Sequence, residues 1–121
     1  WGLNAEFRFD PDPDSTHGDS MKYFLCRLIP PRPTFQADMT PQEAEAMKRH
    51  GAYWKSQADK GTAIAFGPVA DPEGGWGVGI VAVESDEDLL RLQNDDPAVR
   101  AYIGMRYEAY PMPTVIVGRT A

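Results

Sequence analysis

The sequence predicts an α+β domain in which two helices cover one face of a four-stranded antiparallel sheet. Three observations lead to this fold class. The chain has 121 residues, of which 42% are hydrophobic, and this suits one domain with one packed core. Its elements follow one another as strand, helix, strand, strand, helix and strand. Two of the expected strands are apolar on both alternating faces, so both faces of the sheet should be covered.

The first half of the pattern is a strand followed by a long helix. Residues 21–29, MKYFLCRLI, predict the strand, and the prolines that follow predict a loop over 30–39. Thr40 and Glu43 are spaced as a capping box around a proline that suits the first helical turn. Apolar positions every three or four residues then predict a helix over 41–60.

Two further strands and a second helix come next. Residues 62–70 predict the second strand, and the turn-forming residues 71–75 predict a hairpin loop. Residues 76–84, WGVGIVAVE, predict the third strand. Ser85 followed by three acidic residues is typical of a helix start, and this helix should end near Asn94.

The last segment adds a helical turn and the fourth strand. The turn should run over 96–103, and the alternating residues 105–110 predict the strand. Residues 114–118, TVIVG, either extend that strand or pair elsewhere. The complete order is βαββαβ, the order of the ferredoxin-like fold. Because its two helices cover one face only, a second copy of the chain is the simplest cover for the other face, which predicts a homodimer.

Residues 1–20 differ from the rest of the chain, with repeated Asp-Pro and no sustained periodicity. We expect a domain over 21–121 preceded by this segment. One interpretation of the segment is a loose upstream extension. The other is an arm that packs on a neighbouring subunit, because four large apolar side chains in it could be buried there.

Composition excludes several classes of function. The net charge of −6 repels phosphate backbones and anionic lipids, so neither nucleic acid nor a membrane surface is an expected partner. No apolar run approaches the length of a membrane span, and the first residues do not resemble a secretion signal. One cysteine excludes a disulfide within the chain, and one cysteine with two histidines is too few for a zinc site unless carboxylates complete it, so no metal is expected. These features together indicate a reducing cytoplasm.

The residue types that can carry acid–base chemistry include His50 and Asp96. His50 lies beside the apolar stripe of the first predicted helix, and histidine titrates near neutral pH. Asp96 precedes a proline and has a simple interpretation as a helix N-cap. It can also hold the imidazole of His50 by a hydrogen bond, the orienting role of a carboxylate in catalytic triads. The alternative for His50 is a half-exposed residue without a chemical role.

Three other residues are candidates for substrate binding. Arg27 lies in an otherwise apolar strand and can bind a substrate carboxylate or phenolate. Its alternative is an ion pair with Glu108 or Glu84. Trp54 and Trp76 can wall an aromatic pocket, and their alternative is packing in the core or an interface.

From Met21 onward the chain resembles the YCII-related family of small bacterial proteins. The matching features are His50 in the first helix, Gly61, Gly67-Pro68, and the stretch VGIVAVESDEDLLRLQNDDPAV with its Asp-Pro pair. The resemblance implies a ferredoxin-like fold, assembly as a dimeric α/β barrel, and a His–Asp active site that corresponds to His50 and Asp96.

These observations favour a small cofactor-free enzyme that uses His50 as general base or acid and Asp96 as its orienting residue. Its chemistry would be elimination or isomerisation of a small organic molecule. The alternative is a non-catalytic module that binds a small molecule or another protein. A third hypothesis, a cofactor-free oxygenase acting near the tryptophans, is supported by fold analogy alone.

Overall fold

The computed structural model of the chain describes residues 21–118, and the interpretation of residues 1–20 as an extension or arm lies outside them. The elements of the described part are β1 (Lys22–Ile29), α1 (Phe35–Asp38), α2 (Pro41–Asp59), β2 (Ala63–Val69), β3 (Trp76–Val83), α3 (Asp86–Asn94), α4 (Pro97–Arg100) and β4 (Arg106–Met112). In this range no helix is both long enough and apolar enough to cross a membrane.

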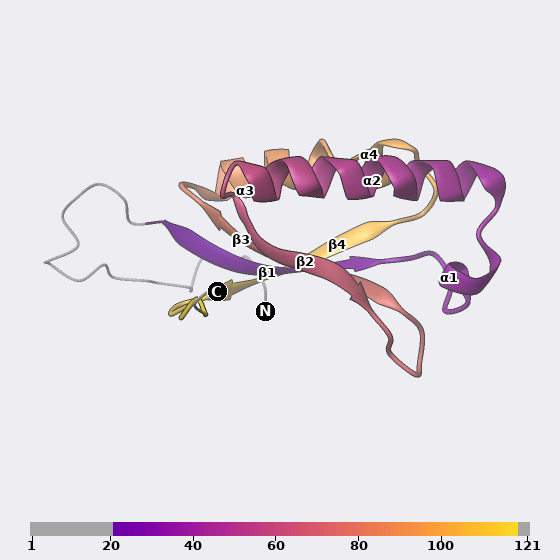
Figure 1. The fold of residues 1–121 in the computed structure, drawn as a ribbon, viewed down its shortest axis with the longest axis horizontal. Coiled ribbons are helices and arrows are strands. Elements are labelled where there is room, and N and C mark those ends of the chain that lie inside the picture. The colour runs from indigo at the N-terminus through magenta and orange to yellow at the C-terminus, as the bar shows by residue number, and fades with distance from the viewer. Residues whose placement is uncertain (1–20, 119–121) are drawn as a thin grey trace, which may run out of the picture.

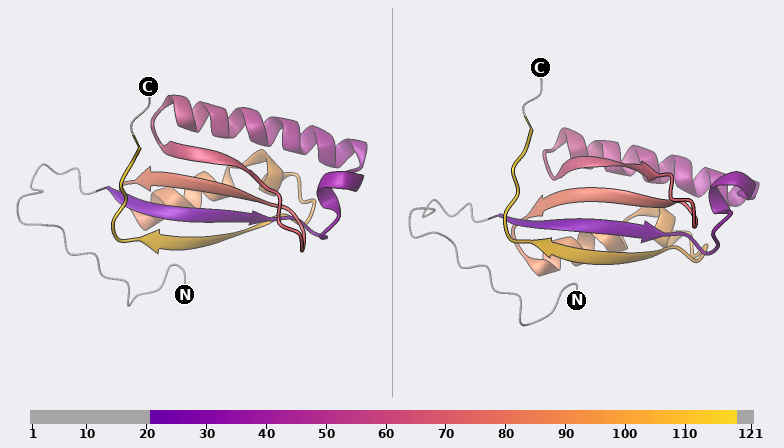
Figure 2. Two further views of the ribbon diagram at one scale, coloured as in Figure 1. Left: turned by 60° about the horizontal axis from the view of Figure 1, so that its bottom comes forward. Right: turned by 90° about the horizontal axis from the view of Figure 1, so that it is seen from below.

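The four strands form one antiparallel sheet in the order β2-β3-β1-β4. Helices α2, α3 and α4 lie together on one side of this sheet (Figure 1). The opposite face is seen in the right-hand view of Figure 2, where no helix crosses the strands. The predicted fold class, an α+β domain of ferredoxin-like topology, is therefore confirmed.

The predicted helix starts are formed by side-chain caps. The hydroxyl of Thr40 accepts a hydrogen bond from the amide of Glu43 at 3.1 Å, and the carboxylate of Glu43 accepts one from the amide of Thr40 at 2.9 Å. Ser85 caps α3 by accepting from the amide of Asp88 at 3.1 Å. Helix α2 is followed by Gly61, whose φ of +84° lies in the left-handed region that favours glycine after a helix.

The core lies between the helices and one face of the sheet. In β1 the side chains of Phe24, Cys26 and Leu28 are buried, while the intervening residues are only half-buried. This alternation places one set against the helices and the other on the open face of the sheet. Val81 and Leu89 extend the core into β3 and α3.

Two segments differ from the sequence prediction. The expected loop over 30–39 contains the short helix α1, which the buried side chain of Phe35 anchors. Strand β4 continues through Pro111, two residues beyond the predicted end. Because β4 is an edge strand, paired only with β1, a missing backbone donor is tolerated there. Residues 114–118 form no strand and leave the sheet after β4 (Figure 2).

Candidate functional site

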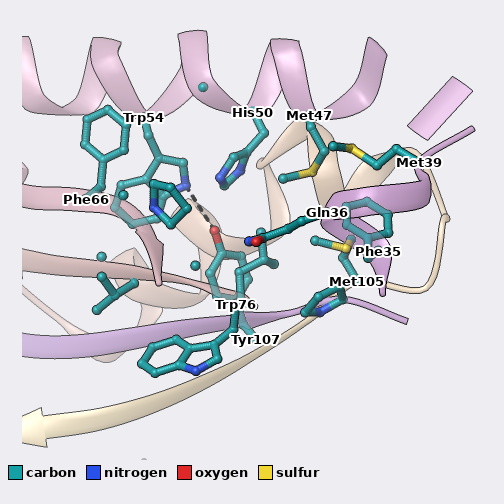
Figure 3. A pocket seen from close by; sticks show the side chains of 18 residues that line it. Phe35, Gln36, Met39, Met47, His50, Trp54, Phe66, Trp76, Met105 and Tyr107 are labelled. Atoms are coloured by element: carbon teal, nitrogen blue, oxygen red, sulfur yellow. Dashed lines mark hydrogen bonds between the residues drawn. The ribbon is translucent and has the colours of Figure 1, made fainter. Parts of the chain in front are cut away.

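A cavity of about 400 Å³ lies between the first half of α2, the loop that carries α1, and the helix-side face of the sheet. Figure 3 shows its principal side chains. Most of the lining is apolar, and the polar side chains come from few positions. The lining residues are Leu28, Pro30, Phe35, Gln36, Met39, Met47, His50, Gly51, Trp54, Phe66, Gly67, Pro68, Trp76, Gly77, Val78, Gly79, Met105 and Tyr107.

His50 projects from α2 into this cavity (Figure 3). Its Nδ1 lies 2.9 Å from Oδ2 and 3.0 Å from Oδ1 of Asp96. Its side chain is 17% exposed. Among residues 21–118, no hydrogen bond involves its Nε2. One ring nitrogen is therefore held by the carboxylate, and the other is available to a molecule in the cavity.

Asp96 is fully buried, with 0% of its surface exposed, and is the N-cap of α4. Its Oδ1 accepts a hydrogen bond from the amide of Ala98 at 2.9 Å. Burial alone would raise the pKa of Asp96, but the hydrogen bond and charge of His50, with the bonds from Tyr107 and Ala98, lower it below the ordinary value. The carboxylate is therefore ionised at neutral pH.

The ionised carboxylate determines the tautomer of the imidazole. A carboxylate without a proton only accepts hydrogen bonds, so Nδ1 of His50 must donate. In the neutral ring the lone pair then lies on Nε2, the nitrogen that has no hydrogen-bond partner among residues 21–118, in a side chain that lines the cavity. This is the arrangement that a general base requires.

Two further side chains donate to the same carboxylate. The indole Nε1 of Trp54 lies 3.1 Å from Oδ2 of Asp96 and 3.0 Å from the hydroxyl of Tyr107. The hydroxyl of Tyr107 in turn donates to Oδ2 of Asp96. Burial and the neighbouring charge of Asp96 raise the pKa of Tyr107 far above its ordinary value, so the phenol keeps its proton and remains a donor.

The positions of Trp54 and Tyr107 follow from local structure. Trp54 is four residues after His50 on α2 and therefore shares its face of the helix. Its ring packs over Gly79, where a Cβ atom would come within 2.5 Å of the indole. Tyr107 lies opposite Leu28 in the sheet, on the helix side. The sequence predicted Trp54 as a pocket wall and did not place Tyr107 in the site, although Met105, Tyr107 and Ala109 form the more apolar set of the alternating fourth strand.

Arg27 and Trp76 are placed on the other face of the sheet. The guanidinium carbon of Arg27 lies 4.3 Å from the centre of the Trp76 ring, and its Nη1 lies 3.4 Å from Oε1 of Glu108. The backbone of Trp76 borders the cavity, but its indole lies beyond the strands, away from His50 (Figure 3). The alternative left open by the sequence, an ion pair between Arg27 and Glu108, is the one that the structure contains.

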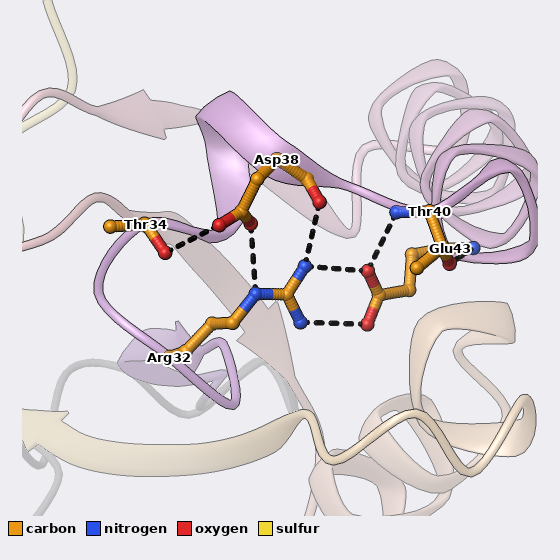
Figure 4. Close-up of polar contacts among 5 residues, drawn as sticks. All are labelled: Arg32, Thr34, Asp38, Thr40 and Glu43. Carbon is orange, nitrogen blue, oxygen red and sulfur yellow. Dashed lines mark hydrogen bonds and ion pairs between the residues drawn. The ribbon is translucent and has the colours of Figure 1, made fainter.

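The outer wall of the cavity is fastened to the start of α2 by Arg32 (Figure 4). Its guanidinium donates two hydrogen bonds to the carboxylate of Glu43, at 2.8 and 2.9 Å, and one from Nε to Asp38 at 2.8 Å. These bonds lower the pKa of Glu43 to about 2. Because Asp38 ends α1 and Glu43 lies in the first turn of α2, Arg32 fixes the position of α1 beside the cavity.

The described residues hold no group of three or more His, Cys, Asp and Glu side chains that could bind a metal ion. Cys26 is buried, and burial raises the pKa of its thiol to about 11. It is therefore protonated at neutral pH and a poor nucleophile. The chemical groups of the site are the imidazole, the carboxylate and their donors.

Fold and site together define a ferredoxin-like α+β domain with a histidine–aspartate pair in the wall of an apolar cavity. The chain belongs to the YCII-related domain family, whose model matches residues 21–113. This confirms the family resemblance seen in the sequence. A comparison with curated proteins found no match to the chain. The catalytic role of His50 and Asp96 therefore stays a prediction.

Proposed function

We propose that the protein is a cofactor-free enzyme in which His50 removes a proton from a small organic molecule. The observation that carries this proposal is the hydrogen bond from Nδ1 of His50 to the buried carboxylate of Asp96, at 2.9 Å. The ring lines the cavity, and its Nε2 has no partner among the described residues. The carboxylate holds the ring in one tautomer and stabilises the imidazolium that forms when Nε2 accepts the proton.

The reaction class follows from the fate of that proton and its electron pair. When Nε2 takes a proton from a carbon acid, the electron pair is left on the substrate. It can then expel a leaving group, and the imidazolium passes its proton to that group or to water, which completes an elimination. Alternatively the imidazolium returns the proton to another carbon, which completes an isomerisation. Both sequences regenerate neutral His50 and need no external electron acceptor.

Hydrogen–deuterium exchange of candidate carbon acids tests this proposal without knowledge of the natural substrate. A panel of small ketones and 1,3-diketones is incubated with the protein in deuterium oxide, and loss of the acidic proton is followed by NMR. We expect His50→Gln to slow catalysed exchange by roughly 100-fold or more, the usual contribution of a general base. Arg49→Gln, an exposed neighbour on α2, is the matched control. Full exchange activity in His50→Gln would refute the proposal.

A non-catalytic binding module is the second candidate function. It is favoured by the apolar lining of the cavity, which would hold a small molecule without any reaction. The two functions differ in one result. A compound that binds in the cavity with acidic protons near His50, yet shows no exchange above the rate in buffer, favours the binding module.

We also propose that the protein forms a homodimer through the open face of its sheet, and that it acts in the cytoplasm. Tyr23, Leu25 and Ile29 on this face are only half-buried. The lone thiol of Cys26 suits a reducing compartment. Sedimentation equilibrium should give twice the chain mass of 13.4 kDa. Leu25→Lys should shift the mass toward the monomer, whereas Leu90→Lys on the exposed side of α3 should not.

A further inference from the structure

The cavity has almost no charge in its lining. None of its lining residues is Asp, Glu, Lys or Arg. The hydroxyl of Tyr107 and the indole N–H of Trp54 are both used in holding Asp96. Two lining side chains have a polar group without a hydrogen-bond partner among the described residues. These groups are Nε2 of His50 and the side-chain amide of Gln36. A charged ligand would therefore lose its hydration without an ion pair to replace it, which is costly.

The side-chain amide of Gln36 reaches across the cavity from α1. Figure 3 shows it extending from α1 into the cavity, with its amide group below the ring of His50. The amide lies against Gly75 in the loop between β2 and β3. A Cβ atom at position 75 would come within 2.3 Å of Oε1 and 2.6 Å of Nε2 of Gln36. Only glycine at this position leaves the amide where it is.

Two other glycines leave room for the body of a ligand. Gly51 follows His50 on α2, and a Cβ atom there would meet nothing within 4 Å. Gly77 lies on β3, and a Cβ atom there would meet only Leu28, at 3.5 Å. The rings of Trp54 and Phe66, whose centres are 6.0 Å apart, also line the cavity. Flat apolar groups pack well against such rings.

We propose that the cavity binds an uncharged molecule with a flat apolar body and that Gln36 orients it, through one hydrogen bond to a carbonyl or hydroxyl group, toward Nε2 of His50. This assignment rests on the proposed function, because it names the substrate class and a positioning residue of the same site. Gly75 is the residue that allows Gln36 to act in this way.

Benzamide, benzoate and toluene are suitable probes, because they share one ring and differ in charge and hydrogen bonding. Dissociation constants are measured at pH 8 by titration calorimetry or ligand-observed NMR. We expect benzamide to bind at least tenfold more tightly than benzoate. Gln36→Leu should weaken benzamide binding about fivefold, the effect of one neutral hydrogen bond, while toluene binding stays unchanged. Gly75→Ala should reproduce the effect of Gln36→Leu.

The unchanged binding of toluene separates orientation from a general loss of structure. Gln42→Leu is the matched control, because Gln42 is exposed in the first turn of α2. Equal binding of benzamide by the Gln36→Leu variant and the unaltered protein would overturn the proposal, as would tighter binding of benzoate than of benzamide. These measurements need no turnover, so a failure of catalysis by His50 leaves the result for Gln36 intact, and the reverse also holds.

Discussion

Replacing Asp96 with asparagine should destabilise the protein strongly. The carboxylate accepts hydrogen bonds from the side chains of His50, Trp54 and Tyr107 and from the amide of Ala98. An asparagine keeps one acceptor oxygen and turns an NH₂ group toward a donor. The indole of Trp54 keeps the hydroxyl of Tyr107 as an acceptor, at 3.0 Å, but the phenol of Tyr107 loses the charged acceptor it had in Oδ2. Bonds to a charged group contribute roughly 1.5–3 kcal/mol each, and breaking a buried pair costs about 3–5 kcal/mol. We expect the free energy of unfolding to fall by about 3–5 kcal/mol.

Urea unfolding at a fixed protein concentration measures this change, and the neighbouring residue provides its control. Asp95 carries the same side chain but is half-exposed and pairs with Arg100 on the surface, at 3.0 Å. Asp95→Asn should change the free energy of unfolding by no more than about 0.5 kcal/mol. If Asp96→Asn costs no more than Asp95→Asn, the buried carboxylate does not organise this site and the reasoning fails.

Three other predictions concern the pH, the cavity and its outer wall. The pKa of Asp96 is lower in the folded state than in the unfolded chain. The contribution of Asp96 to stability should therefore be complete above the pKa of the unfolded chain, about 3.9, and be lost as the pH falls below it. The urea midpoints of the unaltered protein and Asp96→Asn should converge on acidification, and a constant difference between them would contradict this. Gly51→Ala should raise the free energy of unfolding by about 0.5–1 kcal/mol, because glycine is unfavourable within a helix and the added methyl group meets no atom within 4 Å. Ser56→Ala is the exposed control on the same helix. A loss of stability in Gly51→Ala would show that the space beside position 51 is not open. Arg32→Met should accelerate hydrogen exchange at the amide of Ala37, which donates to the backbone carbonyl of Thr34, the N-cap of α1, at 2.9 Å. An unchanged rate would show that α1 holds its place without the arginine.

The fold could be predicted well from the sequence where local signals and burial agree. The capping box at Thr40 and Glu43 and the hydroxyl cap at Ser85 determine where α2 and α3 begin, and both are local patterns. Helix α1 could not be predicted in the same way. Four residues after three prolines carry no helical periodicity, and this helix depends on the burial of Phe35 and the bonds of Arg32, which are contacts made only in the folded chain.

The site was predicted in part. His50 and Asp96 are 46 positions apart in the sequence. An imidazole and a carboxylate can form a hydrogen-bonded pair, but only the family resemblance indicated that these two residues meet in the fold. Arg27 and Trp76 were candidates because of their residue types, a cation in an otherwise apolar strand and an aromatic ring. The two-sided apolar pattern of their strands does not show which face of the sheet each side chain occupies. The register of the sheet decides the face, and it places Arg27 opposite Glu108 and Val78, away from the cavity. The same register places Tyr107 opposite Leu28 on the helix side of the sheet, so its place in the site could not be read from the sequence either.

The donors from Trp54 and Tyr107 change what the pair of His50 and Asp96 can do. In a simple pair the carboxylate would depend on the imidazole for its only strong hydrogen bond. Here the indole, the phenol and the amide of Ala98 stabilise the charge of Asp96 whether or not the ring is protonated. The carboxylate can therefore stay ionised and in place while Nε2 of His50 gains and loses a proton, which is the condition for repeated turnover by a base of fixed geometry.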